Sequence, residues 1–186
     1  RELLADNELE DHGLFEVSDR PTTVKTRIIA HNKHVLRIDE EVTEELHDYH
    51  PFIGMVTSII EKTPIDVILF QDYDKGVIHQ TVIDAVVSLA NKKGIPTIVD
   101  PKMRNFMHYK GVTLFKPNLK EIKEGLGVPI NARDDDELRT NVALLRERLD
   151  ASMALITLSE LGVFIQHPGG EQHMPAFERQ IVDVSG

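Results

Sequence analysis

Residues 65–70 read IDVILF, an almost unbroken apolar run of strand length, and this run decides the fold. Such a run is typical of a parallel strand that is covered on both faces. A polar segment, residues 71–76 (QDYDKG), follows it at once. A buried strand that ends in a charged loop indicates an α/β sheet, in which ligands bind beyond the carboxyl ends of the strands.

The chain downstream of this run alternates between buried strands and amphipathic helices. Apolar residues recur at helical spacing over residues 79–93, and Gly94 is expected to end that helix. The other strands are predicted at 95–99, 112–115, 153–158, 163–167, 172–175 and 181–184, and the other helices at 118–126 and 134–149. This order predicts the α/β class, with a mostly parallel sheet that carries helices on both faces.

The chain upstream of the run has a different pattern of apolar and polar residues. Residues 22–39 are rich in β-branched side chains on either side of a polar turn at 31–34, which predicts a β-hairpin. Residues 40–62 are expected to be helical, with a break at Pro51, because proline removes a backbone donor. Residues 1–19 have helix-like apolar spacing as far as Gly13.

The composition excludes several classes of protein. Among 186 residues, 31 are acidic and 21 are basic, and the resulting net charge of −10 argues against a nucleic-acid partner. The absence of cysteine excludes disulfides, thiolate zinc sites and cysteine nucleophiles. No apolar run approaches the roughly 20 residues of a membrane span, so we expect no membrane segment.

Two polar stretches carry groups that suit a nucleotide. Asn118 and Glu121 lie three residues apart at a predicted helix start, where an amide oxygen and a carboxylate could hold Mg²⁺ directly or through water. The simpler interpretation is a helix cap, and the pair alone favours it. Residues 157–162 (TLSELG) place hydroxyl groups and a glycine after a strand, which suits phosphate or ribose contacts and equally suits an ordinary turn.

A third group of residues suits an anionic sugar. Asp72 and Lys75 follow the buried strand, where a carboxylate could orient hydroxyl groups and an ammonium could neutralise phosphate. A helix-capping loop with a solvated charge pair explains these two residues equally well. Lys25, Arg27 and Arg37 lie on the predicted hairpin and could bind an anion together. The alternative is an exposed strand edge protected by charge, and it is favoured for Lys25.

Five stretches together resemble the ribokinase-like (PfkB) sugar kinases, and within them most closely the heptose-7-phosphate kinases. The stretches are residues 20–27 (RPTTVKTR) with 36–39 (LRID), 72–76 (DYDKG), 100–102 (DPK), 116–121 (KPNLKE) and 183–186 (DVSG). Residues 157–162 and the step 173–175 (HMP) fit as well. The resemblance spans nearly the whole chain. The first two stretches are fairly specific within the family, whereas the Asn118 to Glu121 pattern marks the wider superfamily.

The resemblance implies an enzyme that transfers a phosphoryl group from ATP, with Mg²⁺, to a sugar hydroxyl. It implies an α/β core over residues 40–186 and a small β lid over residues 22–39. The lid would also pair with a partner's lid in a homodimer. By the matching positions, Asn118, Leu119, Lys120, Glu121, Thr157, Ser159 and Gly162 would contact the nucleotide, with Asn118 and Glu121 near Mg²⁺. Lys25, Arg27, Arg37, Asp72 and Lys75 would lie near the sugar phosphate.

The chain departs from the family pattern at both ends. In the family the segment of Ser185 and Gly186, which begins the anion hole, continues as Ala-Gly-Asp, and this Asp is the catalytic base. We therefore expect the chain to be an incomplete part of the kinase domain, without activity by itself. The resemblance implies heptose 7-phosphate as acceptor, in ADP-heptose synthesis for the lipopolysaccharide core, and a cytoplasmic location. Another sugar or nucleoside kinase, or a non-catalytic binding module, remains the alternative.

Overall fold

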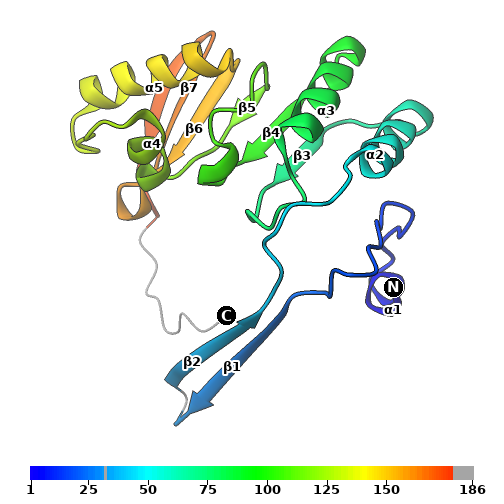
Figure 1. Cartoon of the computed structure of the whole chain (residues 1–186). Coiled ribbons are helices and arrows are strands. Elements are labelled where there is room, and N and C mark those ends of the chain that lie inside the picture. Colours follow the sequence, from blue (N-terminus) through cyan, green and yellow to red (C-terminus); the bar gives the residue numbers. More distant parts are fainter. Residues whose placement is uncertain (32, 178–186) are drawn as a thin grey trace.

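The computed structural model of the chain describes residues 1–31 and 33–177 (Figure 1). The helices are α1 (Glu2–Asp6), α2 (His50–Lys62), α3 (Gln80–Lys93), α4 (Leu119–Leu126) and α5 (Asp135–Leu149), with short 3-10 turns η1 (Met103–Asn105) and η2 (Ser159–Leu161). The strands are β1 (Val24–Ala30), β2 (Lys33–Glu40), β3 (Ile68–Gln71), β4 (Thr97–Asp100), β5 (Leu114–Phe115), β6 (Met153–Thr157), β7 (Val163–His167) and β8 (Gly170–Met174).

Six of these strands form one sheet in the order β3-β4-β5-β6-β7-β8. The pairs from β3 to β6 are parallel, and β7 and β8 add as antiparallel neighbours. The predicted fold class, an α/β fold with a mostly parallel sheet and a separate hairpin, is confirmed. The strand predicted at 181–184 lies outside the described residues.

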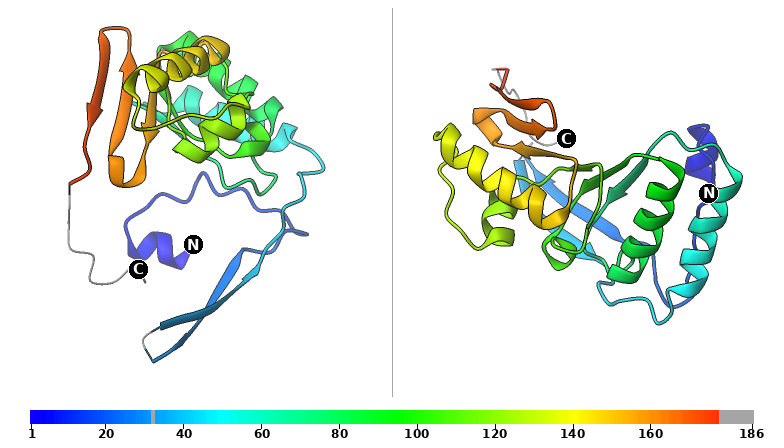
Figure 2. Two further views of the ribbon diagram at one scale, coloured as in Figure 1. Left: turned by 90° about the vertical axis from the view of Figure 1, so that its left-hand side faces the viewer. Right: turned by 90° about the horizontal axis from the view of Figure 1, so that it is seen from above.

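The helices that connect the parallel strands cover one face of this sheet (Figure 2). On that face Phe70, Val99 and Phe115 are registered side by side and buried, and they join one core with residues of α3, α4 and α5. On the opposite face Leu69 is 58% exposed. From β3 to β6, each new strand pairs with the free edge of the strand before it. Right-handed crossovers therefore place all connecting helices on the same face of the sheet. The helices predicted for the second face are not formed by the described part of the chain.

The ends of α3 and α4 follow from local sequence signals. Gly94 and Gly127 cap the two helices at φ values of 70°, in the left-handed region that glycine adopts without steric cost. These ends fix where the chain turns back toward the sheet.

The helix predicted for residues 40–62 is wrong in its first half. Residues 41–49 are irregular, and α2 begins at His50 with Pro51 in its first turn. Proline is tolerated there because the first-turn amides have no helical acceptor, so Pro51 starts the helix and does not interrupt it. The helix predicted in residues 1–19 is also shorter than expected, since α1 ends at Asp6.

Strands β1 and β2 form the predicted hairpin, which extends away from the sheet (Figure 1). The predicted turn is too long, because Lys33 and His34 already belong to β2. Nearly all described side chains of the hairpin are exposed. One face carries Val24, Thr26, Ile28, Leu36 and Ile38, with Glu40 opposite Val24 at its end, and the other carries Lys25, Arg27, Arg37 and Asp39. The hairpin therefore has an apolar face and a charged face.

Candidate functional site

The predicted site residues gather in two places at the carboxyl ends of the parallel strands. The first is the hairpin-base cluster, which consists of Lys25, Arg37, Asp39, Glu41 and Lys75. The second is the α4 pocket, a cavity of about 700 Å³ lined by Asn118, Leu119, Lys120, Lys123, Glu124, Thr157 and Ser159. Each unites segments that are far apart in the sequence.

The hairpin-base cluster is a network of shared ion pairs. Glu41 pairs with Lys75 and lies 3.5 Å from the Lys25 ammonium. Asp39 lies 3.1 Å from Lys25 and 2.9 Å from the Arg37 guanidinium. The Lys75 ammonium lowers the pKa of Glu41, although partial desolvation opposes this. The charged face of the hairpin is thereby connected to the loop after β3.

Arg27 adds uncompensated positive charge to this cluster. It lies directly opposite Arg37 across the hairpin, on the charged face. Like charges in this position destabilise a strand pair. Within residues 1–31 and 33–177, Arg27 has no ion-pair partner, whereas Arg37 shares Asp39 with Lys25. The pair of arginines is therefore suited to an external anion.

A cavity of about 720 Å³ opens beside this cluster, along β3. Its walls are mostly apolar side chains of α2, β3 and α3, and its polar groups include Lys25, Glu41 and Lys75. Tyr73, at the end of β3, also lines it and is 66% exposed. An apolar hollow with charged groups at one end is a common form of ligand site.

Asp72 is buried and holds the loop after β3 in place. Its Oδ2 atom accepts hydrogen bonds from the Tyr109 hydroxyl at 2.8 Å and from the Asn105 amide at 3.2 Å. Its Oδ1 atom accepts from the Asp74 backbone amide at 2.8 Å. Burial raises the pKa of the Tyr109 phenol, and the neighbouring Asp72 carboxylate raises it further. These contacts favour a positioning role for Asp72 over the direct sugar contact that the resemblance implies.

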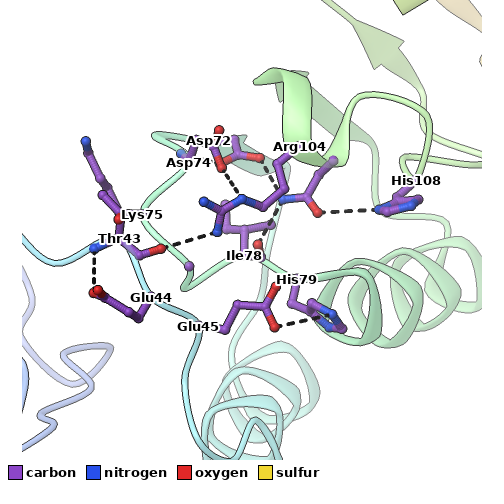
Figure 3. Close-up of polar contacts among 12 residues, drawn as sticks. Thr43, Glu44, Glu45, Asp72, Asp74, Lys75, Ile78, His79, Arg104 and His108 are labelled. Carbon is purple, nitrogen blue, oxygen red and sulfur yellow. Dashed lines mark hydrogen bonds and ion pairs between the residues drawn. The ribbon is translucent and has the colours of Figure 1, made fainter.

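The loop that follows Asp72 is fixed by the chain segments that lie before and after the hairpin. Arg20 donates to the carbonyl oxygens of Glu44, at 2.9 Å, and of Lys75. Gly76 has a φ of 74°, and a Cβ atom there would lie 2.0 Å from the Glu44 carbonyl oxygen. Arg104 spans the same junction, from Thr43 to Asp74 (Figure 3). Lys75 is thus presented beside the hairpin by backbone contacts that no short motif encodes.

The α4 pocket is built from the start of α4 and the end of β6. Asn118 forms a parallel bridge with Thr157, whose amide donates to the Pro117 carbonyl at 3.1 Å. This pairing brings together Asn118, Leu119 and Lys120 with Thr157 and Ser159 in one cavity wall. The hydroxyl, amide and ammonium groups there suit a phosphorylated nucleotide, as the sequence predicts.

Asn118 and Glu121 form a capping box, the simpler of the two predicted roles. The Asn118 side chain accepts from the Glu121 amide at 2.9 Å, and the Glu121 side chain accepts from the Asn118 amide at 2.9 Å. The second Glu121 oxygen accepts from the Lys102 ammonium at 2.8 Å, and this contact raises the pKa of Lys102. Both carboxylate oxygens of Glu121 are therefore engaged within the protein. The pair fits a magnesium ion that is held mainly by phosphate and water and that contacts these two residues through water.

Gly162 closes the loop after β6, although it does not line the α4 pocket. Its φ is 90°, and a Cβ atom there would lie 2.0 Å from the Met174 carbonyl oxygen. Its own carbonyl accepts from the Leu158 amide at 2.8 Å. Within this closed loop Ser159 has a φ of 54°, which is uncommon for a residue other than glycine. Ser159 is held toward the cavity by that geometry.

Asp100, at the end of β4, connects the neighbouring strand ends. It accepts from Gln71 at 3.0 Å, after β3, and from Lys116 at 3.0 Å, after β5. Partial burial acts to raise the pKa of Asp100, but these hydrogen bonds outweigh it and the pKa lies below its ordinary value. The polar edge of the sheet is therefore continuous between the two candidate sites.

Several residues of these sites were missed by sequence reasoning. Glu41, Arg104, Asn105 and Tyr109 belong to no recognisable pattern, and their roles depend on tertiary contacts. Arg20 and Lys102 lie inside quoted stretches, but their spacing does not reveal their partners. Ser185 and Gly186, the predicted start of the anion hole, lie outside the described residues.

No group of three or more histidine or acidic side chains that could hold a metal occurs within residues 1–31 and 33–177. No helix in the described part of the chain is both long and apolar enough to cross a bilayer.

Comparison with known proteins gives a family match over the whole chain. Residues 1–186 match the profile of the pfkB family carbohydrate kinases. The bifunctional protein HldE of Geobacter metallireducens is 35% identical over 177 residues, which cover 94% of this chain and 35% of that protein. The chain spans 35% to 39% of the length of the curated HldE relatives that it matches.

Solved structures of low sequence identity share the fold. Phosphofructokinase-2 of Escherichia coli in complex with fructose-6-phosphate has a TM-score of 0.71 at 16% identity, covering 96% of this chain and 59% of that one. Ribokinase from Giardia lamblia has a TM-score of 0.63 at 14% identity, covering 88% of this chain and 50% of that one. Both are ribokinase-like folds, and this chain corresponds to part of such a domain.

Proposed function

The chain belongs to the pfkB family of carbohydrate kinases, and from that premise we propose that its protein transfers the γ-phosphoryl group of ATP to a phosphorylated sugar. The proposed acceptor is heptose 7-phosphate and the product heptose 1,7-bisphosphate, a step of ADP-heptose synthesis for the lipopolysaccharide core. The stretches that resemble the heptose-7-phosphate kinases and the identity with the HldE relatives support this choice. An enzyme with this need for ATP would work in the cytoplasm.

One observation carries the choice of an anionic acceptor. Arg27 and Arg37 face one another on the charged face of the hairpin, beside Lys25. Together with Lys75 these side chains carry four positive charges, against the two carboxylates of Asp39 and Glu41. Guanidinium groups bind phosphate through paired hydrogen bonds, and a neutral sugar would leave this excess charge uncompensated. The phosphate group of a sugar phosphate would compensate this excess positive charge.

In this proposal the α4 pocket binds the nucleotide. Lys120 and the hydroxyl groups of Thr157 and Ser159 line the cavity and would contact phosphate and ribose. Gly162 would contribute by holding the loop closed, since its tight packing against β8 fixes the position of Ser159. Asn118 and Glu121 would orient the first amides of α4, which attract negative charge.

The residues that would hold Mg²⁺ are Glu121 and Asn118, through water. When bound, the ion neutralises charge on the nucleotide phosphates as phosphoryl transfer proceeds. The contact between Lys102 and Glu121 keeps the carboxylate at the start of α4. Asp72 would serve the sugar side indirectly, by fixing the loop that presents Lys75.

The proposal is tested with the full-length protein and a panel of acceptors. ATP consumption would be followed with heptose 7-phosphate, fructose 6-phosphate, ribose and adenosine. We expect heptose 7-phosphate to have the highest kcat/KM by a wide margin. Faster turnover of ribose or adenosine would show that the acceptor is a neutral sugar or a nucleoside and not heptose 7-phosphate. Nucleotide binding without ATP consumption on any acceptor would indicate a binding module.

We further propose that the hairpin joins two copies in a homodimer. The apolar face of the hairpin leaves Val24, Ile28, Leu36 and Ile38 between 43% and 50% exposed. A two-stranded ribbon is marginally stable alone, and a second layer on this face would bury these side chains. Ile38→Asp in the full-length protein should convert a dimer to a monomer in light scattering. Arg37→Ala, on the opposite face, is the matched control and should remain dimeric.

A further inference from the structure

We infer that His173 is a positioning residue for the nucleotide: it tethers the loop of residues 158–162 and thereby holds Ser159 in the α4 pocket. The inference rests on the proposed nucleotide site. His173 lies in β8, in the stretch 173–175 (HMP) that belongs to the resemblance. Its imidazole makes two hydrogen bonds, one to the loop and one to helix α5.

The contact with the loop is direct. His173 Nε2 lies 3.0 Å from the Leu161 carbonyl oxygen, which can only accept, so the ring nitrogen donates. Leu161 ends η2, the turn that begins at Ser159. Among the described residues, the only side-chain hydrogen bond to the backbone of residues 158–162 is this one. The tether therefore acts on the segment that carries the pocket residue.

The other ring nitrogen fixes the orientation of the imidazole. His173 Nδ1 lies 2.9 Å from an Asp135 carboxylate oxygen, at the start of α5. The two ring nitrogens thus contact two different elements, η2 and α5, and the imidazole lies between them. The Phe164 ring packs edge-on against the imidazole at a centroid distance of 6.2 Å. The His173 side chain is only 28% exposed, and its position is fixed by its contacts with Asp135, Leu161 and Phe164.

The backbone of the same loop confirms how tightly it packs on β8. Phe164 and His173 are registered partners, as are Val163 and Met174. The absence of a side chain at Gly162 allows the loop to approach the Met174 carbonyl oxygen. The loop is therefore held by a backbone contact at Gly162 and by a side-chain contact at Leu161. Removing the His173 contact with Leu161 should increase the mobility of Ser159, while the pairing of β7 with β8 is kept.

The test uses the full-length protein with three variants. His173→Phe keeps an aromatic ring but removes both ring nitrogens, and His173→Gln keeps a side-chain N–H group that can donate. His167→Gln, on β7, is the matched control, because among the described residues the His167 side chain hydrogen-bonds only to the Gly169 amide. For His173→Phe we expect the KM for ATP and the Kd for ADP to rise about fivefold, the effect of one net hydrogen bond, with kcat unchanged. His173→Gln should recover most of this loss, and the control should match the unchanged protein.

Hydrogen exchange provides a readout that needs no nucleotide. In His173→Phe the amides of Leu158, Leu161 and Gly162 should exchange faster, while amides of β6 keep their rates. Unchanged exchange in the loop, or a loss of kcat with unchanged KM, would overturn the inference. If the unchanged protein binds no nucleotide, the proposed function fails together with the positioning role. Faster loop exchange in the same sample would then show that the tether itself is real, so the two failures can be distinguished.

Discussion

The two candidate sites are assembled in different ways. The α4 pocket is built by backbone geometry: a capping box, a strand bridge between Asn118 and Thr157, and a glycine packed against β8. The hairpin-base cluster is built by ion pairs between an exposed ribbon and a loop of the core. The first arrangement is fixed within the fold. The second depends on ion pairs between partly exposed side chains, in which an external charge can take the place of a partner.

Both sites nevertheless depend on a close backbone approach at one glycine. The first prediction, with the largest expected effect, is that Gly76→Ala and Gly162→Ala each lower the free energy of unfolding by about 3–5 kcal/mol, because the new Cβ atom overlaps a carbonyl oxygen at positive φ. Gly94→Ala has a similar φ and nothing within 4 Å of the new atom, so it should cost only about 1–2 kcal/mol. Urea unfolding of the full-length protein measures all three. Equal losses at the three positions would contradict the packing described here.

The second prediction separates the sites by charge. Arg27→Ala or Arg37→Ala should raise the KM for heptose 7-phosphate about 10- to 100-fold, since each removes charge-assisted hydrogen bonds to phosphate. The KM for ATP should stay within about twofold, because the hairpin does not line the α4 pocket. Steady-state kinetics on both substrates check this. Lys33→Ala, at the far end of the hairpin, is the control. An equal rise in the KM for heptose 7-phosphate in this variant would show that the hairpin acts only through its overall positive charge, and not through contacts of Arg27 and Arg37 with phosphate.

The third prediction concerns the other site. Glu121→Ala should reduce Mg²⁺-dependent turnover about tenfold, because it removes a carboxylate that orients the start of α4. A titration of rate against Mg²⁺ in the full-length protein should shift to higher concentrations, with the KM for the sugar unchanged. Glu124→Ala, on the rim of the same pocket and exposed, is the control. An unchanged rate and an unchanged Mg²⁺ requirement would remove Glu121 from the site.

The fourth and smallest effect is a dependence on pH. Since the pKa of Glu41 is lowered in the folded protein, its ion pair with Lys75 contributes stability above the ordinary glutamate value of 4.5, and this contribution is lost as the pH falls below that value. The free energy of unfolding of Glu41→Gln should therefore fall less steeply between pH 4.5 and pH 3 than that of the unchanged protein. Urea midpoints across this range measure the difference. Parallel curves would show that the pair makes no contribution.

The local features of the fold could be predicted from the sequence. The helix ends at Gly94 and Gly127 and the capping box at Asn118 are encoded within a few residues, so pattern and propensity were sufficient. The apolar run at residues 65–70 does form a strand, but β3 covers only Ile68–Gln71, and Leu69 on its second face is exposed. Residues 40–49 were predicted wrongly as helix, because Pro51 was interpreted as a break inside one long helix. It lies instead in the first turn of α2, which begins at His50. The face on which the helices lie depends on strand order, which no local pattern specifies.

The site was predicted only where its members lie in such local patterns. Residues 118–121 and 157–159 were both expected beside a nucleotide. Asn118, Leu119 and Lys120 line one cavity with Thr157 and Ser159, whereas Glu121 does not line it. The buried role of Asp72 depends on Tyr109, 37 residues away, and the position of Lys75 depends on Arg20, 55 residues away. Hydrogen bonds over such separations follow from the tertiary fold, and a single sequence has no spacing that indicates them.

The most direct test of the central claim compares one sugar with and without its phosphate. In the full-length protein, kcat/KM would be measured for heptose 7-phosphate and for the unphosphorylated heptose, and again in the variant with both Arg27→Ala and Arg37→Ala. A phosphate held by two guanidinium groups predicts a preference of at least about 100-fold, reduced to a few-fold in the double variant. Equal turnover of the two sugars, or a preference that survives loss of both arginines, would contradict an anionic acceptor bound at the hairpin base.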